Sequence, residues 1–454
     1  MTLQICGVGG FNEVGKNMTA VRVDDEVVIL DMGLHLDAYV NYTEDADNVD
    51  LSAYALSKIG AIPDIEPIKK WKKLVKAIIP THAHLDHVGA IPFMSNKFTS
   101  PIICTPFTAE VIFRICKDEK IKLNNEIKVL NVNCSYKISD NITIEFVNMT
   151  HSTPQTVMVI VHTKYGKVIY GNDFKFDNNP TLGKKPNFEK LKRIGEISEN
   201  SEDPKSKVVA LIVDCTRANN DGKTPSEQVA RELLKDVMLC CNSEGKAVIV
   251  TTFSSHIARL KSIIEFGNKL ERKVILLGRS LGKYVGAAEA IKIVDFSREA
   301  TVICYKKKIA RMLEEVKKDR SKYLIVCTGH QAEPKSVLSR IISGEFKFEL
   351  EKEDHIIFSC DVIPTTINIA NRKILEEKIK KKGVRLFKKI HVSGHAARED
   401  LRDLINMVKP KHIIPAHGNL SMKTALVDLC QEMGYETEKQ VHIIQDGQFI
   451  DFVD

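Results

Sequence analysis

The segment Thr81–Val88 constrains the fold and the chemistry of this chain more than any other. It reads Thr-His-Ala-His-Leu-Asp-His-Val, so three imidazoles and one carboxylate lie within six positions, directly behind the apolar run Val75–Pro80. Alternate residues of an extended strand share a face, which places His82 and His84 on one side, with the other two groups on the following loop. A lone histidine is usually a core or surface residue. Four such groups at this density predict a site for Zn²⁺ or a similar divalent ion.

Six further apolar, strand-like runs lead into an acidic or histidine side chain. In open α/β sheets, functional groups gather where strands give way to loops. Any one of these residues is weak evidence, because strands often end in a polar residue that caps a turn. Their repetition predicts one polar rim built from many segments: Asp31, His151, Asp173, Asp214, His395 and His417.

Taken in chain order, these motifs resemble a known family. The histidine-rich segment matches the signature of the metallo-β-lactamase superfamily. The later positions resemble its third and fourth motifs and motifs A, B and C of its β-CASP nucleases, in the order His151, Asp173, Asp214, His395 and His417. Three longer segments resemble the ribonuclease J family within that group, namely Gly9–Met18, Gly171–Asp177 and His391–Ala396.

The resemblance implies an α/β fold: a metallo-β-lactamase αββα sandwich with an inserted α/β β-CASP domain. We expect the sandwich to be formed by residues 1–215 and 386–454, and the insertion by residues 216–385. From Ser226 onward, strand-like and helix-like runs alternate, which is typical of a parallel α/β unit. The segment Asn187–Pro204 is predicted to be a surface segment. The chain resembles the short form of the family, without an additional C-terminal domain.

The resemblance also implies the ligands of two divalent ions, expected to be Zn²⁺, with Mn²⁺ or Mg²⁺ as alternatives. One ion would be held by His82, His84 and His151, the other by Asp86, His87 and His417, with Asp173 as the bridge. Asp86 and His395 are the expected catalytic residues, and His395 would hydrogen-bond the scissile phosphate. Asp31 and Asp214 are expected to orient ligand imidazoles from behind.

Contacts to RNA are predicted at two places. The backbone and hydroxyl groups around motif B can meet a phosphate, and a loop in the inserted domain can stack a base. The residues concerned are Ser393, Gly394, His395, Ala396, Phe253, Ser254 and His330. His330 departs from the family, whose usual loop is Thr-Gly-Ser-Gln-Gly-Glu-Pro, whereas Thr328–Pro334 here reads Thr-Gly-His-Gln-Ala-Glu-Pro.

The Gly10–Asn17 segment nearly fits a phosphate-binding P-loop, Gly-x-x-x-x-Gly-Lys-Ser/Thr. Asn17 replaces the hydroxyl that would meet Mg²⁺, and the residues that follow have a strand pattern, whereas a P-loop must open a helix. We therefore expect these glycines to form a tight turn at the edge of the site.

Composition sets the remaining bounds. A length of 454 residues favours two domains, and a net charge of +7 permits an anionic partner without requiring one. The eleven cysteines include no Cys-x-x-Cys pair, which favours a reducing compartment. There is no recognisable signal peptide, and no apolar run approaches the roughly 18 residues that span a bilayer. We expect a cytoplasmic protein that does not contact membranes and that forms a homodimer.

The predicted function is metal-dependent hydrolysis of single-stranded RNA in decay or processing. The family implies 5′→3′ exonuclease action that favours 5′-monophosphate ends, with possible endonuclease cuts. A β-CASP DNA nuclease and a catalytically inactive RNA-binding scaffold stay open as alternatives. A small-molecule hydrolase is disfavoured, because it explains neither the inserted domain nor His395.

Overall fold

The computed structural model describes residues 2–44, 50–363 and 366–452. The chain forms two compact units. Unit 1 comprises Met1–Asn178, Gly183–Thr224 and Gly394–Asp454, and unit 2 comprises Asn179–Leu182 and Pro225–Ser393. Unit 1 is thus assembled from both ends of the chain.

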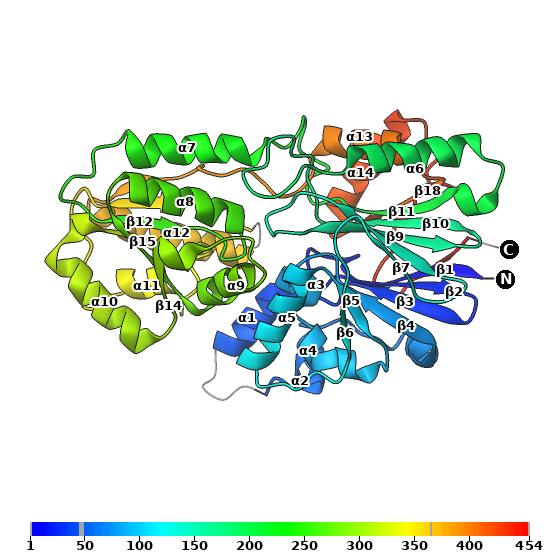
Figure 1. Cartoon of the computed structure of the whole chain (residues 1–454), viewed down its shortest axis with the longest axis horizontal. Coiled ribbons are helices and arrows are strands. Elements are labelled where there is room, and N and C mark those ends of the chain that lie inside the picture. The colour runs from blue at the N-terminus through cyan, green and yellow to red at the C-terminus, as the bar shows by residue number, and fades with distance from the viewer. Residues whose placement is uncertain (1, 45–49, 364–365, 453–454) are drawn as a thin grey trace. The chain divides into compact units, whose positions relative to one another are not determined.

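Two β-sheets form the centre of unit 1 (Figure 1). The first has the order β19 (Phe449–Asp451), β1 (Leu3–Gly9), β2 (Met18–Val23), β3 (Glu26–Leu30), β4 (Val75–Ile79), β5 (Ile102–Cys104) and β6 (Ile127–Val129). The second has the order β18 (His412–Ala416), β11 (Val208–Asp214), β10 (Gly166–Gly171), β9 (Val157–Thr163), β8 (Thr143–Asn148) and β7 (Ser135–Lys137). A shared core of buried side chains from both sheets includes Val28, Leu30, Phe146, Val159 and Ile212.

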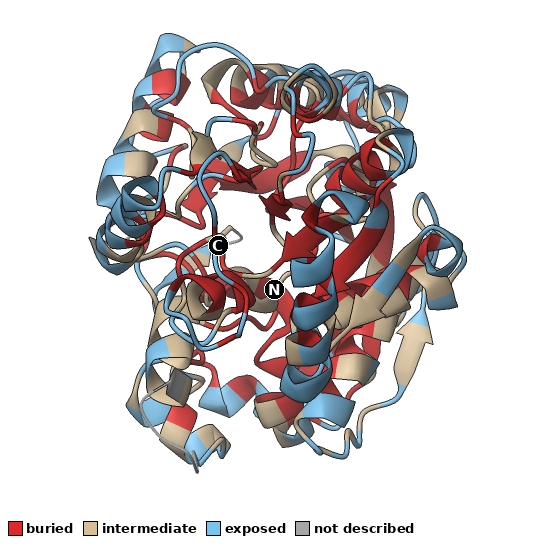
Figure 2. Cartoon of the chain, turned by 90° about the vertical axis from the view of Figure 1, so that its left-hand side faces the viewer, coloured by how far each residue is buried: buried red, intermediate tan, exposed pale blue. Residues whose placement is uncertain are grey.

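Helices flank these sheets, which gives the αββα order expected from the sequence. On the first half of the chain they are α1 (Leu36–Glu44), α2 (Ala53–Lys58), α3 (Leu85–Val88), α4 (Ile91–Met94) and α5 (Pro106–Asp118). The second sheet packs against α6 (Phe188–Asn200), α13 (Arg398–Val408) and α14 (Leu420–Glu432) through a second apolar core. Because both its faces are covered, β11 is buried along its whole length. Figure 2 shows the same contrast between buried strands and helices with exposed outer faces.

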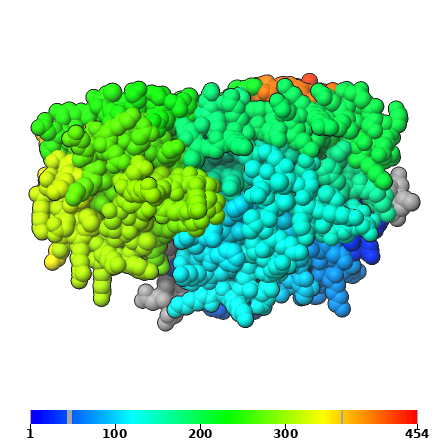
Figure 3. Space-filling view, in the orientation of Figure 1, coloured from blue at the N-terminus to red at the C-terminus, as the bar shows by residue number. Residues whose placement is uncertain are grey.

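The segment Asn187–Pro204, expected at the surface, is mostly helix α6, whose outer face is exposed and whose inner face packs on unit 1. Leu191 and Ile194 lie on one face of this helix and are buried in the core beneath. Gly195 lets α6 approach α13 closely, since a Cβ at that position would lie 2.0 Å from the carbonyl oxygen of Met407. The two helices lie side by side at the surface of unit 1 (Figure 3).

The histidine-rich segment differs from the expected strand and loop. Strand β4 ends at Ile79, three residues before His82, and His84 is the N-terminal cap of the short helix α3. The carboxylate and imidazole that follow, Asp86 and His87, therefore lie within a helical turn. The side chains still converge, but because of this turn rather than because of the alternation of a strand.

Unit 2 has one sheet of parallel strands, in the order β14 (Ala300–Ile303), β13 (Lys273–Leu277), β15 (Tyr323–Cys327), β12 (Val248–Thr251), β16 (His355–Phe358) and β17 (Arg385–Phe387). Its helices are α7 (Glu227–Leu239), α8 (Ile257–Lys269), α9 (Arg279–Ala290), α10 (Lys306–Lys318), α11 (Val337–Ile342) and α12 (Thr366–Lys381). The expected alternation of strands and helices from Ser226 onward is confirmed. Ser226 itself caps α7, its side chain accepting from the backbone N–H of Gln228.

In the described parts of the chain, no helix is both long enough and apolar enough to cross a membrane.

Candidate metal centre

Three residues of the predicted polar rim lie just after strands of unit 1 and share an unusual backbone conformation. Asp31 comes after β3, Asp173 follows β10, and His417 comes after β18. Their φ angles are +59°, +51° and +56°, in the left-handed region that residues other than glycine seldom adopt. Non-glycine residues held in this way often mark functional sites, because the surrounding fold must maintain a conformation that costs about 1 kcal/mol or more.

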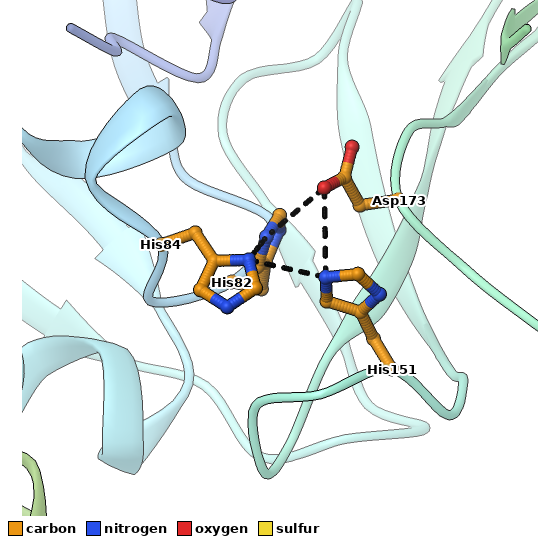
Figure 4. Close-up of side chains that lie close together, drawn as sticks. All are labelled: His82, His84, His151 and Asp173. Atoms are coloured by element: carbon orange, nitrogen blue, oxygen red, sulfur yellow. Dashed lines mark hydrogen bonds and ion pairs between the residues drawn. The ribbon is translucent and has the colours of Figure 1, made fainter. Parts of the chain in front are cut away.

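Three histidines and Asp173 form the first cluster (Figure 4). Nδ1 of His84 lies 3.1 Å from Nε2 of His82 and 3.1 Å from Nε2 of His151. Both of those Nε2 atoms lie 3.5 Å from Oδ2 of Asp173. Figure 4 shows the three rings and the carboxylate pointing toward one another, with His82 and His84 on one segment and His151 and Asp173 on two others.

A second cluster shares the same aspartate. Oδ1 of Asp173 lies 3.2 Å from Nε2 of His87 and 3.5 Å from Nε2 of His417. Oδ2 of Asp86 lies 3.6 Å and 3.7 Å from the same two nitrogens. One oxygen of Asp173 thus faces each cluster, and together the two clusters bring all seven of the predicted ligands to one place.

Electrostatics keep the imidazoles of the first cluster neutral. Burial is the main reason that the pKa of His82 and that of His151 lie well below the ordinary value, and burial also lowers the pKa of His84, to about 4. Asp173 behaves in the opposite way. Burial raises its pKa, but the neighbouring imidazoles His417 and His87 outweigh this effect and hold the pKa well below the ordinary value. The cluster therefore offers neutral nitrogen lone pairs beside an ionised carboxylate at neutral pH.

His87 differs from the other ligand candidates. Burial lowers its pKa, but the carboxylates of Asp173, Asp31 and Asp86 outweigh burial and raise the pKa well above the ordinary value. Asp31 accepts a hydrogen bond from Nδ1 of His87 at 2.7 Å and further bonds from the backbone and hydroxyl of Thr81. These contacts hold His87 with Nε2 directed toward the cluster.

The donor set fits divalent metal ions. Oδ1 of Asp173 is buried and accepts no hydrogen bond from the described residues, although imidazole nitrogens surround it. A buried carboxylate oxygen without a donor is costly unless a cation is bound there. Nitrogen and oxygen ligands of this kind are those that Zn²⁺ and Mn²⁺ take in proteins. The chain thus carries a histidine and aspartate cluster able to bind metal ions.

Asp214 has a different partner from the one predicted. It was expected to orient a ligand imidazole, but its Oδ2 lies 2.7 Å from Nδ1 of His395, which is not in either ligand cluster. Oδ1 of Asp214 accepts from the backbone N–H of Thr216 at 2.8 Å, which fixes the carboxylate. Asp214 therefore aims Nε2 of His395 toward Asp173, whose Oδ2 lies 4.0 Å away.

His395 combines an accessible ring with a raised basicity. Its side chain is 26% exposed, so a ligand can reach it. Burial lowers its pKa, but the carboxylates of Asp214 and Asp173 outweigh burial and raise the pKa to about 9. The ring is accordingly protonated at neutral pH in the metal-free chain.

The remaining predicted RNA contacts divide between the two units. In unit 2, the rings of Phe253 and His330 are 4.3 Å apart between centroids, and Ser254 hydrogen-bonds Ser280 at 2.9 Å. Ser393 belongs to unit 2, whereas Gly394 and the two residues after it belong to unit 1. The carbonyl oxygen of Gly394 accepts from Nδ1 of His151 at 2.7 Å, so in unit 1 motif B touches a ligand candidate directly.

Asn17 is a site residue that the sequence did not predict. It is 1% exposed and lies 2.9 Å, through Oδ1, from Nδ1 of His417. The only signal in the sequence was its place in the segment Gly9–Met18, which resembles ribonuclease J but has no metal-ligand spacing. Its role depends on a contact across 400 residues of chain.

Three family descriptions match parts of the chain. Residues 57–185 match the beta-lactamase superfamily domain, residues 245–376 match the ribonuclease J beta-CASP domain, and residues 383–443 match the Zn-dependent metallo-hydrolase RNA specificity domain. These matches confirm the fold class expected from the sequence.

Several named relatives match nearly the whole chain. The Ribonuclease J of Methanocaldococcus jannaschii is 42% identical over 100% of this chain and 99% of its own length. That of Pyrococcus abyssi is 41% identical over 99% and 97%. That of Synechocystis is 29% identical over 99% of this chain and 65% of its own length. A solved structure described as a protein of unknown function from Enterococcus faecalis V583 has a TM-score of 0.64 at 16% identity, covering 99% of this chain and all of that one.

Proposed function

The chain belongs to the ribonuclease J family, and from that premise we propose that it hydrolyses single-stranded RNA with two divalent ions held in unit 1. The observation that carries the proposal is the convergence on Asp173 of two ligand clusters from distant segments. That the enzyme is a metal-dependent ribonuclease follows from the family. The ligand sets, the number of ions and the direction of cleavage are the proposal.

In this proposal each cluster holds one ion. His82, His84 and His151 would hold the first, Asp86, His87 and His417 would hold the second, and Asp173 would be shared by both. When bound, such ions stabilise charge on a phosphodiester and lower the pKa of water toward about 7. Zn²⁺ is the ion we propose, and Mn²⁺ fits the same ligands.

The residues of the chain then have separate tasks. Asp31 holds the ring of His87, and Asp214 holds the ring of His395. His395 hydrogen-bonds the scissile phosphate and is placed to give a proton to the departing 3′ oxygen. Water adds to phosphorus as the bond to that 3′ oxygen breaks, so the products are a 5′-phosphate and a 3′-hydroxyl. Ser393, Gly394 and Ala396 offer further hydrogen bonds to phosphate, and Phe253, Ser254 and His330 are proposed to contact RNA.

We further propose 5′→3′ exonuclease action that favours a 5′-monophosphate, with endonuclease cuts as a secondary activity. A homodimer and a cytoplasmic location stay predictions, and light scattering of the purified protein tests the first.

The test is digestion of one RNA sequence prepared with a 5′-monophosphate, a 5′-triphosphate or a 5′-hydroxyl, in the presence of Zn²⁺ or Mn²⁺. Label at the 5′ end should appear in mononucleotides, fastest from the monophosphate. Label at the 3′ end should stay in long fragments until late in the reaction. Release of 3′-terminal nucleotides first would refute the direction.

Two controls separate the rival functions. DNA of equal sequence should resist cleavage, and equal rates on the two substrates would favour a DNA nuclease. Metal analysis should return about two ions per chain. A chain with less than one ion and no cleavage of any RNA would instead be an RNA-binding scaffold.

A further inference from the structure

The glycine-rich segment Gly9–Asn17 is hydrogen-bonded to two residues of the second ligand cluster. The backbone N–H of His417 donates to the carbonyl oxygen of Gly10 at 2.7 Å, and the backbone N–H of Asn17 donates to the carbonyl oxygen of Asp86 at 3.0 Å. Gly33 in turn donates to the carbonyl oxygen of Asn17 at 3.0 Å. This segment therefore joins the strand end that carries His417 to the helical turn that carries Asp86.

The side chain of Asn17 lies between ligand candidates of this cluster. Its Nδ2 lies 3.1 Å from the carbonyl oxygen of Asp86 and 3.1 Å from Nε2 of His87. Its Oδ1 lies 2.9 Å from Nδ1 of His417 and 3.2 Å from Nδ2 of Asn172. All of these groups are buried or nearly so, and a buried carboxamide with partners at both ends is held in one position.

The carbonyl oxygen of Asp86 settles the orientation of the carboxamide. A carbonyl oxygen only accepts hydrogen bonds, so the NH₂ end of Asn17 must face it. The oxygen end then faces Nδ1 of His417, and Nδ1 must carry the hydrogen, because two lone pairs 2.9 Å apart would repel. The backbone N–H of Gly15 lies 3.4 Å from the same nitrogen, which makes it the weaker of the two neighbours.

Protonation of Nδ1 has a consequence at the other ring nitrogen. A neutral imidazole with its hydrogen on Nδ1 has a lone pair on Nε2. Nε2 of His417 lies 3.5 Å from Oδ1 of Asp173 and 3.7 Å from Oδ2 of Asp86. The lone pair is thus directed to the place where the second ion is proposed.

We infer that Asn17 is a positioning residue for the second metal ion, which fixes the tautomer and orientation of His417 while holding the backbone of Asp86. The inference rests on the metal centre proposed above. It also assigns a task to the segment that resembles a P-loop, namely to support a metal ligand rather than to bind a nucleotide phosphate.

The absence of a side chain at Gly10 supports this assignment. Gly10 has a φ of +84°, and a Cβ there would lie 2.5 Å from Oδ1 of Asn17. A larger residue at this position would displace the carboxamide oxygen that His417 requires.

The experiment is titration of metal-free protein with Zn²⁺ in competition with a chromophoric chelator. The test variant is Asn17→Leu, which keeps the size of the side chain and removes both hydrogen-bonding ends. Asn12→Leu is the matched control, because Asn12 is an exposed residue of the same segment. We expect Asn17→Leu to weaken the binding of one of the two ions by about 10–100-fold, the usual effect of removing a group that orients a ligand. The other ion and the Asn12→Leu control should bind as the unchanged protein does.

Each other outcome has a distinct meaning. Affinities within about twofold of the unchanged protein for both ions would overturn the role of Asn17. An equal loss of affinity for both ions would also overturn the role of Asn17, since such a loss would indicate a general disturbance of unit 1. If the unchanged protein itself binds fewer than two ions, the proposed centre fails, which the wild-type titration alone reveals.

A second measurement tests the tautomer without metal or activity. Histidine-selective ¹⁵N NMR of the metal-free protein distinguishes Nδ1–H from Nε2–H imidazoles, and His417→Gln identifies the signal. We expect His417 to be the Nδ1–H tautomer in the unchanged protein and in Asn12→Leu, and a mixture of tautomers in Asn17→Leu. A pure Nε2–H signal in the unchanged protein would contradict the assignment.

Discussion

Each unit buries a cluster of charged groups, and the two clusters are balanced in different ways. In unit 2, the guanidinium of Arg259 is fully buried and donates to both carboxylate oxygens of Glu227, at 2.5 Å and 2.8 Å. It also donates to the carbonyl and hydroxyl oxygens of Ser359 at 2.9 Å and 2.8 Å. In unit 1, by contrast, the imidazoles of His82, His84 and His151 crowd together around a single shared carboxylate.

The difference distinguishes a structural cluster from a functional one. Burial raises the pKa of Glu227, but the charges of His256 and Arg259 outweigh it and hold the pKa well below the ordinary value. That cluster is satisfied by its own members. The cluster in unit 1 leaves lone pairs and an oxygen of Asp173 without a donor, so it requires a cation from outside. A buried polar cluster that is incomplete is thus the better indicator of a binding site.

The largest effect is expected for His84→Ala, which removes the ligand candidate nearest to two others. Cleavage of RNA should fall by at least about 10³-fold, because charge on the phosphate is no longer stabilised. The matched control is His162→Ala, a partly exposed histidine of β9 that pairs with Glu145. Activity that survives His84→Ala would remove the metal assignment, as would an equal loss in the control.

Next in size is Arg259→Met in unit 2. It leaves Glu227 buried without its charge partner, so we expect the free energy of unfolding to fall by about 3 kcal/mol or more. The exposed pair Arg298–Asp295 is the control, and Arg298→Met should change the free energy of unfolding by less than about 0.5 kcal/mol. Urea unfolding measures both. Replacing Arg259 and Glu227 together by apolar residues should recover much of the loss, and no recovery would contradict a self-balanced pair.

Removal of metal should destabilise unit 1 and leave unit 2 unchanged. An ion present at 100 times its dissociation constant stabilises the folded protein by about 2.7 kcal/mol, which chelation removes. Hydrogen exchange of chelated protein should accelerate around α3 and the ends of β10 and β18. Amides of β12 and β15 in unit 2 should not change. Equal acceleration in both units would show that the metal is not confined to the proposed centre.

The smallest effect concerns pH. Because the pKa of Glu227 is lowered in the folded protein, its ionised carboxylate stabilises the fold at pH values above the ordinary pKa of 4.5. This stabilisation is lost as the pH falls below 4.5 toward the lower pKa of the folded protein. One proton is involved, so the slope is at most about 1.4 kcal/mol per pH unit. Urea midpoints between pH 5 and pH 3 should therefore fall less steeply in Glu227→Gln than in the unchanged protein. If the urea midpoints of the two proteins depended on pH in the same way, His256 and Arg259 would not lower the pKa of Glu227.

Much of the site could be predicted from the sequence, because metal ligands need particular side chains and those stand at the ends of apolar runs. His82, His84 and Asp86 are close in the chain, so local spacing alone brought them together. The local shape was less predictable. The expected strand at His82 and His84 is a bend leading into α3, since the apolar pattern stops at Pro80 and says nothing about the backbone after it.

Sequence alone determined which side chains were available, and the resemblance of its ordered motifs indicated the family. It also determined that strands and helices alternate after Ser226, because the periodicity of apolar residues is a local property. Only the tertiary structure decided that Asp214 holds His395 rather than a ligand, and that Asn17 touches His417. Those pairings join residues 181 and 400 positions apart. Hydrogen bonds of this kind form only after the sheets pack, so no local pattern in the chain encodes them.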